Sequence, residues 1–270
     1  MRPLNSVVCI KPVPDERFWD KIRLDPKTGT LRRKGIPIEL CSVEKSALEE
    51  ALRIREARGG KVTVISMGPP GTEEILEWGI VLGADEGVLL SDREFAGADT
   101  LATAYALAEG IKKLGGADLI FLGNESLDGS TGQVGPQVAE FLDMQHVTHV
   151  SKLDLIDDDT LRAKFHIEFG YIDVEVKMPV VLAVEKDINE PRVPSIWGAV
   201  WIQERKIDCW TAEDVGADKS RLGLPGSPTQ VSDVKTIELK RKGEMLSGEP
   251  SDIAKQLFQK LRADKVLPEA

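Results

Sequence analysis

Short apolar segments alternate with helical patterns over the first half of the chain, and this alternation restricts the fold more than any other feature. Strands are predicted at 6–11, 61–67, 86–90 and 118–122, and helices at 46–57, 73–82, 101–114 and 133–142. Repeated strand–helix–strand units form a parallel sheet whose crossover helices cover both faces. The segment DLIFL at 118–122 has almost no polar residue, as expected for a strand covered on both faces. The sequence therefore predicts an α/β fold with an open, mainly parallel sheet and helices on both faces.

Three β-type segments follow one another after Gln145 without a helical pattern between them. They lie at 146–155, 160–169 and 171–176. Turns join these segments, so antiparallel β-hairpins added to the sheet are predicted. The apolar run that follows, at 180–184, predicts another buried strand.

The chain beyond Lys186 is rich in proline, glycine and charged residues, as in NEPRVPS and GLPGSPT. This composition indicates an extended C-terminal arm without a core of its own, and an amphipathic helix is predicted at 251–262. We therefore divide the chain into an α/β domain with a hairpin extension at 1–187 and a loop, arm and C-terminal helix at 188–270.

Composition excludes several classes of protein. The formal net charge is −10, which argues against nucleic-acid binding because phosphates are neutralised by a basic face. The longest apolar run, Met178–Val184, is far shorter than the ~20 residues of a membrane-spanning helix, so no membrane insertion is expected. The three widely spaced cysteines fit a reduced, cytoplasmic protein. No metal site is expected at His146 and His149, since alternation along a strand places these rings on opposite faces.

Three of the predicted strands end where open parallel sheets bind their ligands, because the carboxyl ends of parallel strands share one edge. The segments at these ends are Cys9–Val13, Ser66–Pro70 and Gly123–Thr131. The third segment opens a glycine-rich loop, GNESLDGSTGQVGP at Gly123–Pro136, which leads from a strand into a helix.

Several features of this loop predict a phosphate cradle. Its glycines permit backbone conformations that aim N–H groups at one point, Ser130 and Thr131 add hydroxyl donors, and the helix begins with unpaired N–H groups. Asp128 would repel a phosphate, so we interpret it as a turn former or a brace of the loop. The alternative is an ordinary βα loop in which Ser130 or Thr131 caps the helix. The sequence has neither a Walker A motif nor a GxGxxG turn.

The chain resembles the beta subunit of electron-transfer flavoproteins over nearly its whole length. Ordered matches carry the similarity, among them VVCIKPVPD, KVTVISMGPP, FAGADTLATAYALA, LDGSTGQVGP, KDINEPRVPSI and RLGLPGSPTQV. The resemblance implies an adenine-nucleotide alpha-hydrolase-like fold and an electron-carrier subunit without an active site of its own. It also implies a heterodimer with an alpha subunit that holds FAD, while the beta subunit holds either AMP or a second FAD.

The resemblance further implies which residues contact the nucleotide. These are Cys9, Cys41, Ser42, Val64, Ser66, Met67, Gly123, Asn124, Asp128, Gly129, Ser130, Thr131, Gly132, Gln133, Val134 and Thr229. The DG-x-T-x-QVGP form of the loop and GSPT at Gly226–Thr229 are similar to the FAD-holding group, which bifurcates electrons from NADH and so adds ferredoxin as an acceptor. FAD is therefore the expected cofactor. AMP is the alternative, because the chain departs from the family pattern at Cys41–Ser42, Asn124–Glu125, Ser130 and His166.

A protein-docking segment, VPSIWGAVWI, is implied after Asn189–Arg192. In the family this segment docks partner dehydrogenases, and we expect Ile196, Trp197 and Trp201 to be the docking residues, since tryptophan is enriched at interface hot spots. The partner expected is a dehydrogenase or a quinone oxidoreductase. The alternative is that both tryptophans pack on the protein's own sheet or on the alpha subunit.

Two other classes of protein use the same fold. A nucleotide-hydrolysing enzyme needs an SGG-type phosphate loop or clustered carboxylates for a metal, and the sequence has no such set. A stress-type nucleotide-binding homodimer does not need the long arm, which favours a chain that wraps around another protein.

Overall fold

The computed structural model describes residues 2–15, 17–18, 23–24, 31–32, 35–202, 205–230 and 243–267. The chain forms two compact units, Met1–Ser232 and Asp233–Ala270. The first unit holds the main sheet, and the second holds helix α6, Pro250–Ala263. The functional division between residues 187 and 188 stays a prediction.

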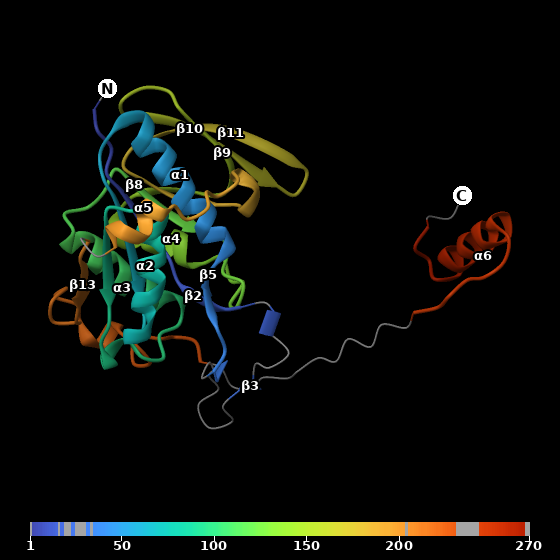
Figure 1. Cartoon of the computed structure of the whole chain (residues 1–270), viewed down its shortest axis with the longest axis horizontal. Coiled ribbons are helices and arrows are strands. Elements are labelled where there is room, and N and C mark those ends of the chain that lie inside the picture. The colour runs from blue at the N-terminus through green and yellow to red at the C-terminus, as the bar shows by residue number, and fades with distance from the viewer. Residues whose placement is uncertain are drawn as a thin grey trace. The chain divides into compact units, whose positions relative to one another are not determined.

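Within the part of the chain that the structure describes, nine strands form the main sheet. They are β1 Ser6–Cys9, β6 Val62–Met67, β7 Glu86–Leu90, β8 Leu119–Gly123, β9 Gln145–Leu155, β10 Thr160–Ile167, β11 Gly170–Lys177, β12 Val180–Val184 and β13 Ile207–Trp210. Their order across the sheet is β11-β10-β9-β12-β8-β1-β6-β7-β13. The neighbouring strands β9, β12, β8, β1, β6, β7 and β13 all pair in parallel. Strands β9, β10 and β11 pair antiparallel and lie side by side at one end of the sheet (Figure 1). The predicted open, mainly parallel sheet with a hairpin addition is therefore confirmed.

In the described residues, two small antiparallel pairs lie outside this sheet and were not predicted. Strand β2, Pro12–Pro14, pairs with β5, Ile38–Leu40. Strand β3, Arg23–Leu24, pairs with β4, Leu31–Arg32. The first of these pairs continues directly from β1 and lies beside the start of the first helix, so it belongs to the edge where the candidate site is built.

Helices cover both faces of the main sheet, as the strand–helix alternation predicts. They are α1 Ser42–Arg58, α2 Glu73–Leu82, α3 Thr100–Lys113 and α4 Val134–Leu142, with a short α5 at Ile196–Trp201 and single 3₁₀ turns at Pro70–Thr72, Arg93–Phe95, Lys186–Ile188 and Lys219–Arg221. Alternate strand residues point to opposite faces. Val8 and Val64 accordingly pack with α1 and α2, whereas Val7 and Ile65 pack with α3 and α4.

The first residues of α1, α2 and α3 differ in whether a side chain caps the helix. Asp99 caps α3, since its carboxylate accepts the backbone N–H groups of Leu101 and Ala102. Thr72 occupies the position before α2, but no side chain among the described residues caps this helix, because the buried Thr72 packs against Gly68 instead. Helix α1 begins at Ser42, one turn before the start predicted at residue 46. The prediction missed this start because Cys41, at the N-cap position, is not a capping residue.

The first part of the region beyond Lys186 packs within the first unit and does not form the extended arm that was predicted. Strand β13 adds to the sheet beside β7, and Ala212, Val215 and Leu222 are buried against the α3 and α4 face. In the second unit, the helix predicted at 251–262 is present as α6, and none of its residues is buried. In the described ranges, no helix has both the length and the apolar character needed to cross a bilayer.

Helix α5 touches α2 through a glycine. A Cβ atom at Gly198 would overlap the backbone of Val81, so only glycine permits this approach. We expect Gly198→Ala to lower the free energy of unfolding by roughly 1–3 kcal/mol, the usual cost of overpacking. Chemical denaturation followed by circular dichroism measures this change.

Gly71→Ala is the matched control, because a Cβ at Gly71 meets nothing within 4 Å. Equal stability of the two variants would contradict the close packing of α5 on α2.

Candidate functional site

Three strand ends meet at one edge of the sheet. Strand β1 lies between β8 and β6 and runs parallel to both, with Val8 opposite Phe121 on one side and Val64 on the other. The segments that follow these strands therefore leave the sheet at the same edge, as predicted. The first turn of α1 closes the edge, because a Cβ at Gly123 would come within 3.2 Å of both Val43 and Glu44.

The loop after β8 is ordered by its own hydrogen bonds. The backbone N–H of Ser130 donates to the carbonyl of Ser126 at 2.9 Å, and the N–H of Gly129 donates to the hydroxyl of Ser126 at 3.3 Å. Ser130 and Gly132 have φ values of 46° and 63°, in the left-handed region that favours glycine. The loop thus turns sharply before it enters α4.

The N-terminus of α4 keeps its donors available. Among the described residues no side chain caps α4, whose N-cap residue is Gln133. The predicted alternative, capping by Ser130 or Thr131, is therefore wrong: the Ser130 hydroxyl donates to the carbonyl of Ser126 at 3.2 Å, and the Thr131 side chain is exposed. Uncapped N–H groups at a helix start, with the partial positive charge found there, form a site suited to an anion.

Asp128 braces the loop through Lys11. The Lys11 ammonium binds the Asp128 carboxylate at 2.7 Å, and the backbone N–H of Lys11 donates to the Glu44 carboxylate at 2.6 Å. These contacts join the end of β1, the first turn of α1 and the loop after β8. They match the interpretation of Asp128 as a brace, and they place a compensating cation beside it.

Burial controls the titration of three groups beneath the loop. Burial raises the pKa of Glu44 to about 8, although the hydrogen bond from the Lys11 backbone acts in the opposite direction. Burial also raises the pKa of the Cys9 and Cys41 thiols, and Glu44 adds to the effect at both. The Cys41 side chain packs beside Val13 and Val43. Thiols held in this way are poor nucleophiles, so they serve as small apolar residues of the wall.

The other predicted contact residues divide between the cradle and the core. The Ser66 side chain is buried. Within the described residues, neither its hydroxyl nor that of Ser42 has a hydrogen-bond partner. Met67 is partly buried on the α3 and α4 face, whereas the Val64 side chain lies in the core against Gly79. The role of these residues as nucleotide contacts stays a prediction.

Asn124 and Thr229 have structural partners at the same edge. The backbone N–H of Asn124 donates to the carbonyl of Val184 at 2.8 Å, and its side chain accepts the N–H of His149 at 3.1 Å. Thr229 donates its backbone N–H and its hydroxyl to the Asp99 carboxylate, at 3.0 and 2.7 Å. These bonds fix both predicted residues in place.

Residues 99 and 100 link the cradle to the GSPT segment. Thr100 donates its hydroxyl to the side-chain oxygen of Gln133 at 3.0 Å, next to Asp99, which holds Thr229. The starts of α3 and α4 and the segment Gly226–Thr229 therefore lie together. Lys11 and Ser126 lie within the segments predicted at this edge, Cys9–Val13 and Gly123–Thr131, but neither was named as a site residue. A cation at the end of the first predicted strand was the available signal for Lys11.

The predicted docking segment is exposed. The side chains of Ile196 and Trp197 are 85% and 69% exposed, and Val193 and Val200 beside them are also exposed. Within the described unit, the predicted alternative that Trp197 packs on the protein's own sheet is therefore wrong. The side chain of Trp201 lies outside the part of the chain that the structure describes.

His149 binds the Glu185 carboxylate through Nδ1 at 2.7 Å, and His146 is exposed. In the ranges that the structure describes, no group of three or more His, Cys, Asp or Glu residues is arranged to hold a metal ion.

Comparison with known proteins gives consistent matches. A family model described as electron transfer flavoprotein domain matches residues 28–208. The chain is 46% identical over 265 residues to electron transfer flavoprotein subunit beta of Thermoanaerobacterium thermosaccharolyticum, with 98% of this chain and 100% of that protein covered. It is 44% identical over 261 residues to the protein of the same name from Clostridium acetobutylicum, with 97% and 99% covered. It is 40% identical over 266 residues to subunit CarD of the caffeyl-CoA reductase-Etf complex of Acetobacterium woodii, with 98% and 100% covered.

The buried Glu44 makes stability depend on pH. Because its folded pKa of about 8 lies above the ordinary 4.5, the folded state retains a proton that the unfolded chain releases between these values. This contribution to stability is fully present below pH 4.5 and is lost as the pH rises to 8. We expect the free energy of unfolding to fall by about 1.4 kcal/mol for each pH unit in this window on account of Glu44.

Glu44→Gln removes the titrating group and keeps the acceptor for Lys11. Urea denaturation of the variant at several pH values is expected to show a shallower decline than that of the wild type. Glu74→Gln, at an exposed position on α2, is the control. A decline of the same slope in Glu44→Gln and the wild type would contradict a protonated Glu44.

Proposed function

Since the chain belongs to the electron transfer flavoprotein family as a beta subunit, we propose that it holds FAD at the edge formed by β8, β1 and β6 and takes part in flavin-based electron bifurcation. Electrons would pass between NADH or a dehydrogenase and acceptors that include ferredoxin. The observation that carries the cofactor proposal is the uncapped start of α4 behind a glycine-rich loop. The subunit acts as an electron carrier without catalytic residues of its own.

The residues at this edge fit the phosphates of an adenine nucleotide. The backbone N–H groups of Val134 and Gly135 begin α4, and the hydroxyls of Ser130 and Thr131 lie in the loop before it. The buried, unpaired hydroxyls of Ser42 and Ser66 are further donors. When bound, FAD would supply a group that accepts and gives electrons singly or in pairs. Within the site, the chain's part is to bind and orient the nucleotide.

The continuity of the cradle with the segment Gly226–Thr229 favours FAD over AMP. Thr229 and Gln133 are held by neighbouring residues at the start of α3, so the GSPT segment and the phosphate cradle form one continuous edge. A dinucleotide has groups that could contact both segments, whereas AMP needs only the cradle. The relative in the caffeyl-CoA reductase-Etf complex, whose name places an electron transfer flavoprotein in a larger redox assembly, favours the same choice. The alternative is a non-bifurcating carrier with structural AMP.

Two protein partners are part of this proposal. Beta subunits of the family pair with an alpha subunit, and we assign the exposed side chains of Leu257 and Phe258 on α6 to that partner. The exposed Ile196 and Trp197, with Trp201, would dock a dehydrogenase or a quinone oxidoreductase. The proposed location is the cytoplasm, because the three cysteines are unpaired and a reducing compartment keeps thiols in that state.

Quantifying the released nucleotides tests the cofactor assignment. The chain is co-expressed with its alpha subunit, the purified heterodimer is denatured, and FAD and AMP are separated and counted. Two FAD per heterodimer are expected. One FAD with one AMP would replace the bifurcating proposal by the AMP alternative, and absence of flavin would overturn both.

Truncation of the exposed apolar side chains tests the docking segment. We expect the double variant Ile196→Ala/Trp197→Ala to raise the KM for the dehydrogenase that reduces the complex by roughly 10-fold or more, since removal of a hot-spot residue costs over about 1–2 kcal/mol. The kcat at saturating dehydrogenase and the nucleotide content should stay the same.

Ile156→Ala, at an exposed apolar position on the turn between β9 and β10, is the matched control. A KM that changes equally in the control and in the double variant would remove the docking assignment.

A further inference from the structure

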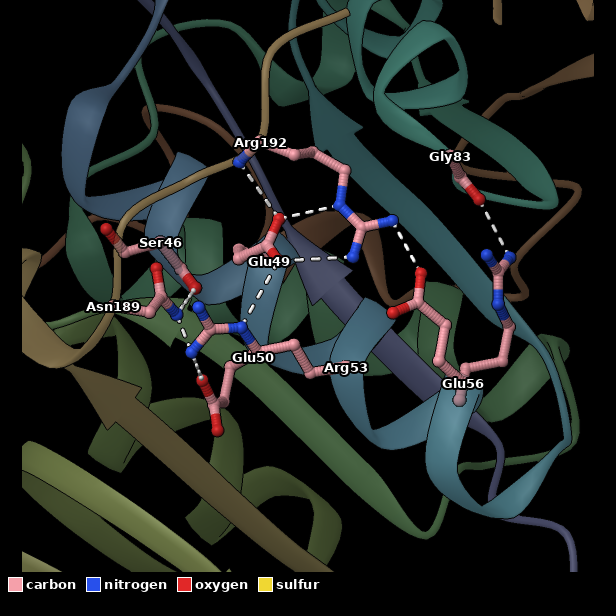
Figure 2. A network of polar contacts seen from close by, with 9 residues as sticks. Ser46, Glu49, Glu50, Arg53, Glu56, Gly83, Asn189 and Arg192 are labelled. Atoms are coloured by element: carbon pink, nitrogen blue, oxygen red, sulfur yellow. Dashed lines mark hydrogen bonds and ion pairs between the residues drawn. The ribbon is translucent and has the colours of Figure 1, made fainter. Parts of the chain in front are cut away.

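A short stretch before the docking segment is tied to α1 (Figure 2). The guanidinium of Arg192 donates two hydrogen bonds to the Glu49 carboxylate, at 2.7 and 3.1 Å, and a third to Glu56 at 2.6 Å. The backbone N–H of Arg192 donates to the same Glu49 carboxylate at 3.0 Å. Because Glu49 and Glu56 lie two turns apart on one face of α1, a single arginine spans that face.

Asn189 and Lys186 extend this attachment along the helix. The side-chain amide of Asn189 donates to the carbonyl of Ser46 at 2.9 Å and to the Glu50 carboxylate at 3.0 Å, as Figure 2 shows. The Ser46 hydroxyl donates to the carbonyl of Lys186 at 2.8 Å. Residues 186–192 are therefore held on α1 at successive points, and they lead directly into the docking segment.

The Arg192–Glu49 contact differs from an ordinary surface ion pair. The Glu49 side chain is only 7% exposed. Burial by itself would raise the pKa of Glu49, but the hydrogen bonds from Arg192 outweigh burial and hold the pKa below its ordinary value. A two-pronged guanidinium–carboxylate contact fixes orientation as well as distance, and a lysine cannot reproduce it. Removal of Arg192 would leave a buried carboxylate without its main partner.

A second attachment lies on the other side of the exposed side chains. Gly198 packs against the backbone of Val81 on α2, and the Ser195 hydroxyl accepts the N–H of Gly198 at 3.0 Å at the start of α5. Val193, Ile196 and Trp197 are exposed between the two attachments. Without these attachments, the segment would sample many conformations in solution. Binding a partner would then cost the conformational entropy of ordering it.

We propose that Arg192 is a positioning residue for partner recognition. By fixing residues 193–201 to α1 before a partner arrives, it presents Ile196 and Trp197 in one arrangement, which reduces the ordering cost of association. The proposal rests on the proposed docking function of this segment. It assigns to Arg192 no contact with the partner or with the nucleotide.

The experiment uses the full heterodimer with Arg192→Ala, Arg192→Lys and, as the matched control, Arg53→Ala. Arg53 also binds Glu49, at 3.3 Å, but it lies on α1 itself and cannot tie the docking segment. Amide hydrogen exchange of residues 193–202 is measured against that of β6. We expect Arg192→Ala to accelerate exchange in 193–202 by roughly 10-fold to 100-fold, Arg192→Lys to give an intermediate effect, and Arg53→Ala to leave it unchanged.

The functional measurement separates positioning from general loss of structure. The KM for the dehydrogenase that reduces the wild-type complex, sought among acyl-CoA and 2-hydroxy acid dehydrogenases, should rise by about 10-fold in Arg192→Ala. The kcat, the nucleotide content and exchange in β6 should be unchanged.

Each contrary result has a defined meaning. Exchange in 193–202 that is equal in Arg192→Ala and Arg53→Ala would overturn the positioning role. An unchanged KM in Arg192→Ala, with a raised KM in Ile196→Ala/Trp197→Ala, would also overturn it while the docking function stands. If the apolar double variant has an unchanged KM, the docking function itself fails, and the role of Arg192 in recognition fails with it.

Discussion

Three glutamate side chains on α1 are buried, and both candidate sites depend on the hydrogen-bond donor that contacts each carboxyl group. Glu44 accepts a backbone N–H at the end of β1, beneath the cradle. Glu49 accepts the guanidinium of Arg192, and Glu50 accepts the side-chain amide of Asn189. A carboxyl group taken out of water is stable only when a donor is held against it, so α1 fixes the segments that supply these donors. One helix thus holds the floor of the cradle and the base of the docking segment.

The strand–helix order of the first unit was predictable because each element is local. Buried strands such as β8 and β12 have continuous apolar runs, and the carboxylate cap of α3 needs only Asp99 and the residues just after it. Strand β13 was not predicted, because four residues at the sheet edge carry too weak an alternation within a charged and proline-rich region. The early start of α1 was missed because Cys41 and Ser42 gave no recognised capping signal.

The sites were predictable only in part, because their contacts join distant parts of the sequence. The glycine-rich loop could be recognised from its own residues, and the interpretation of Asp128 as a brace followed from its charge. The partner that braces it, Lys11, lies 117 residues earlier, and Arg192 and Glu49 are 143 residues apart. No local pattern reports such a pair. The exposed Ile196 and Trp197 were identified by resemblance, whereas their attachment to α1 required the structure.

If the cradle holds the phosphate of a nucleotide, as we propose, the pairing of Lys11 with Asp128 limits how it can recognise that anion. With the ammonium engaged by a carboxylate, attraction for a phosphate comes from backbone dipoles and hydroxyl groups. Dipoles fixed in a loop respond to the direction of an oxygen lone pair more than to the net charge of the ligand, and they act over a short range that dissolved salt screens little. A cradle of this kind accepts a terminal phosphate and an internal pyrophosphate alike. The surroundings of the cradle, and not the cradle itself, would then decide how long a nucleotide the subunit carries.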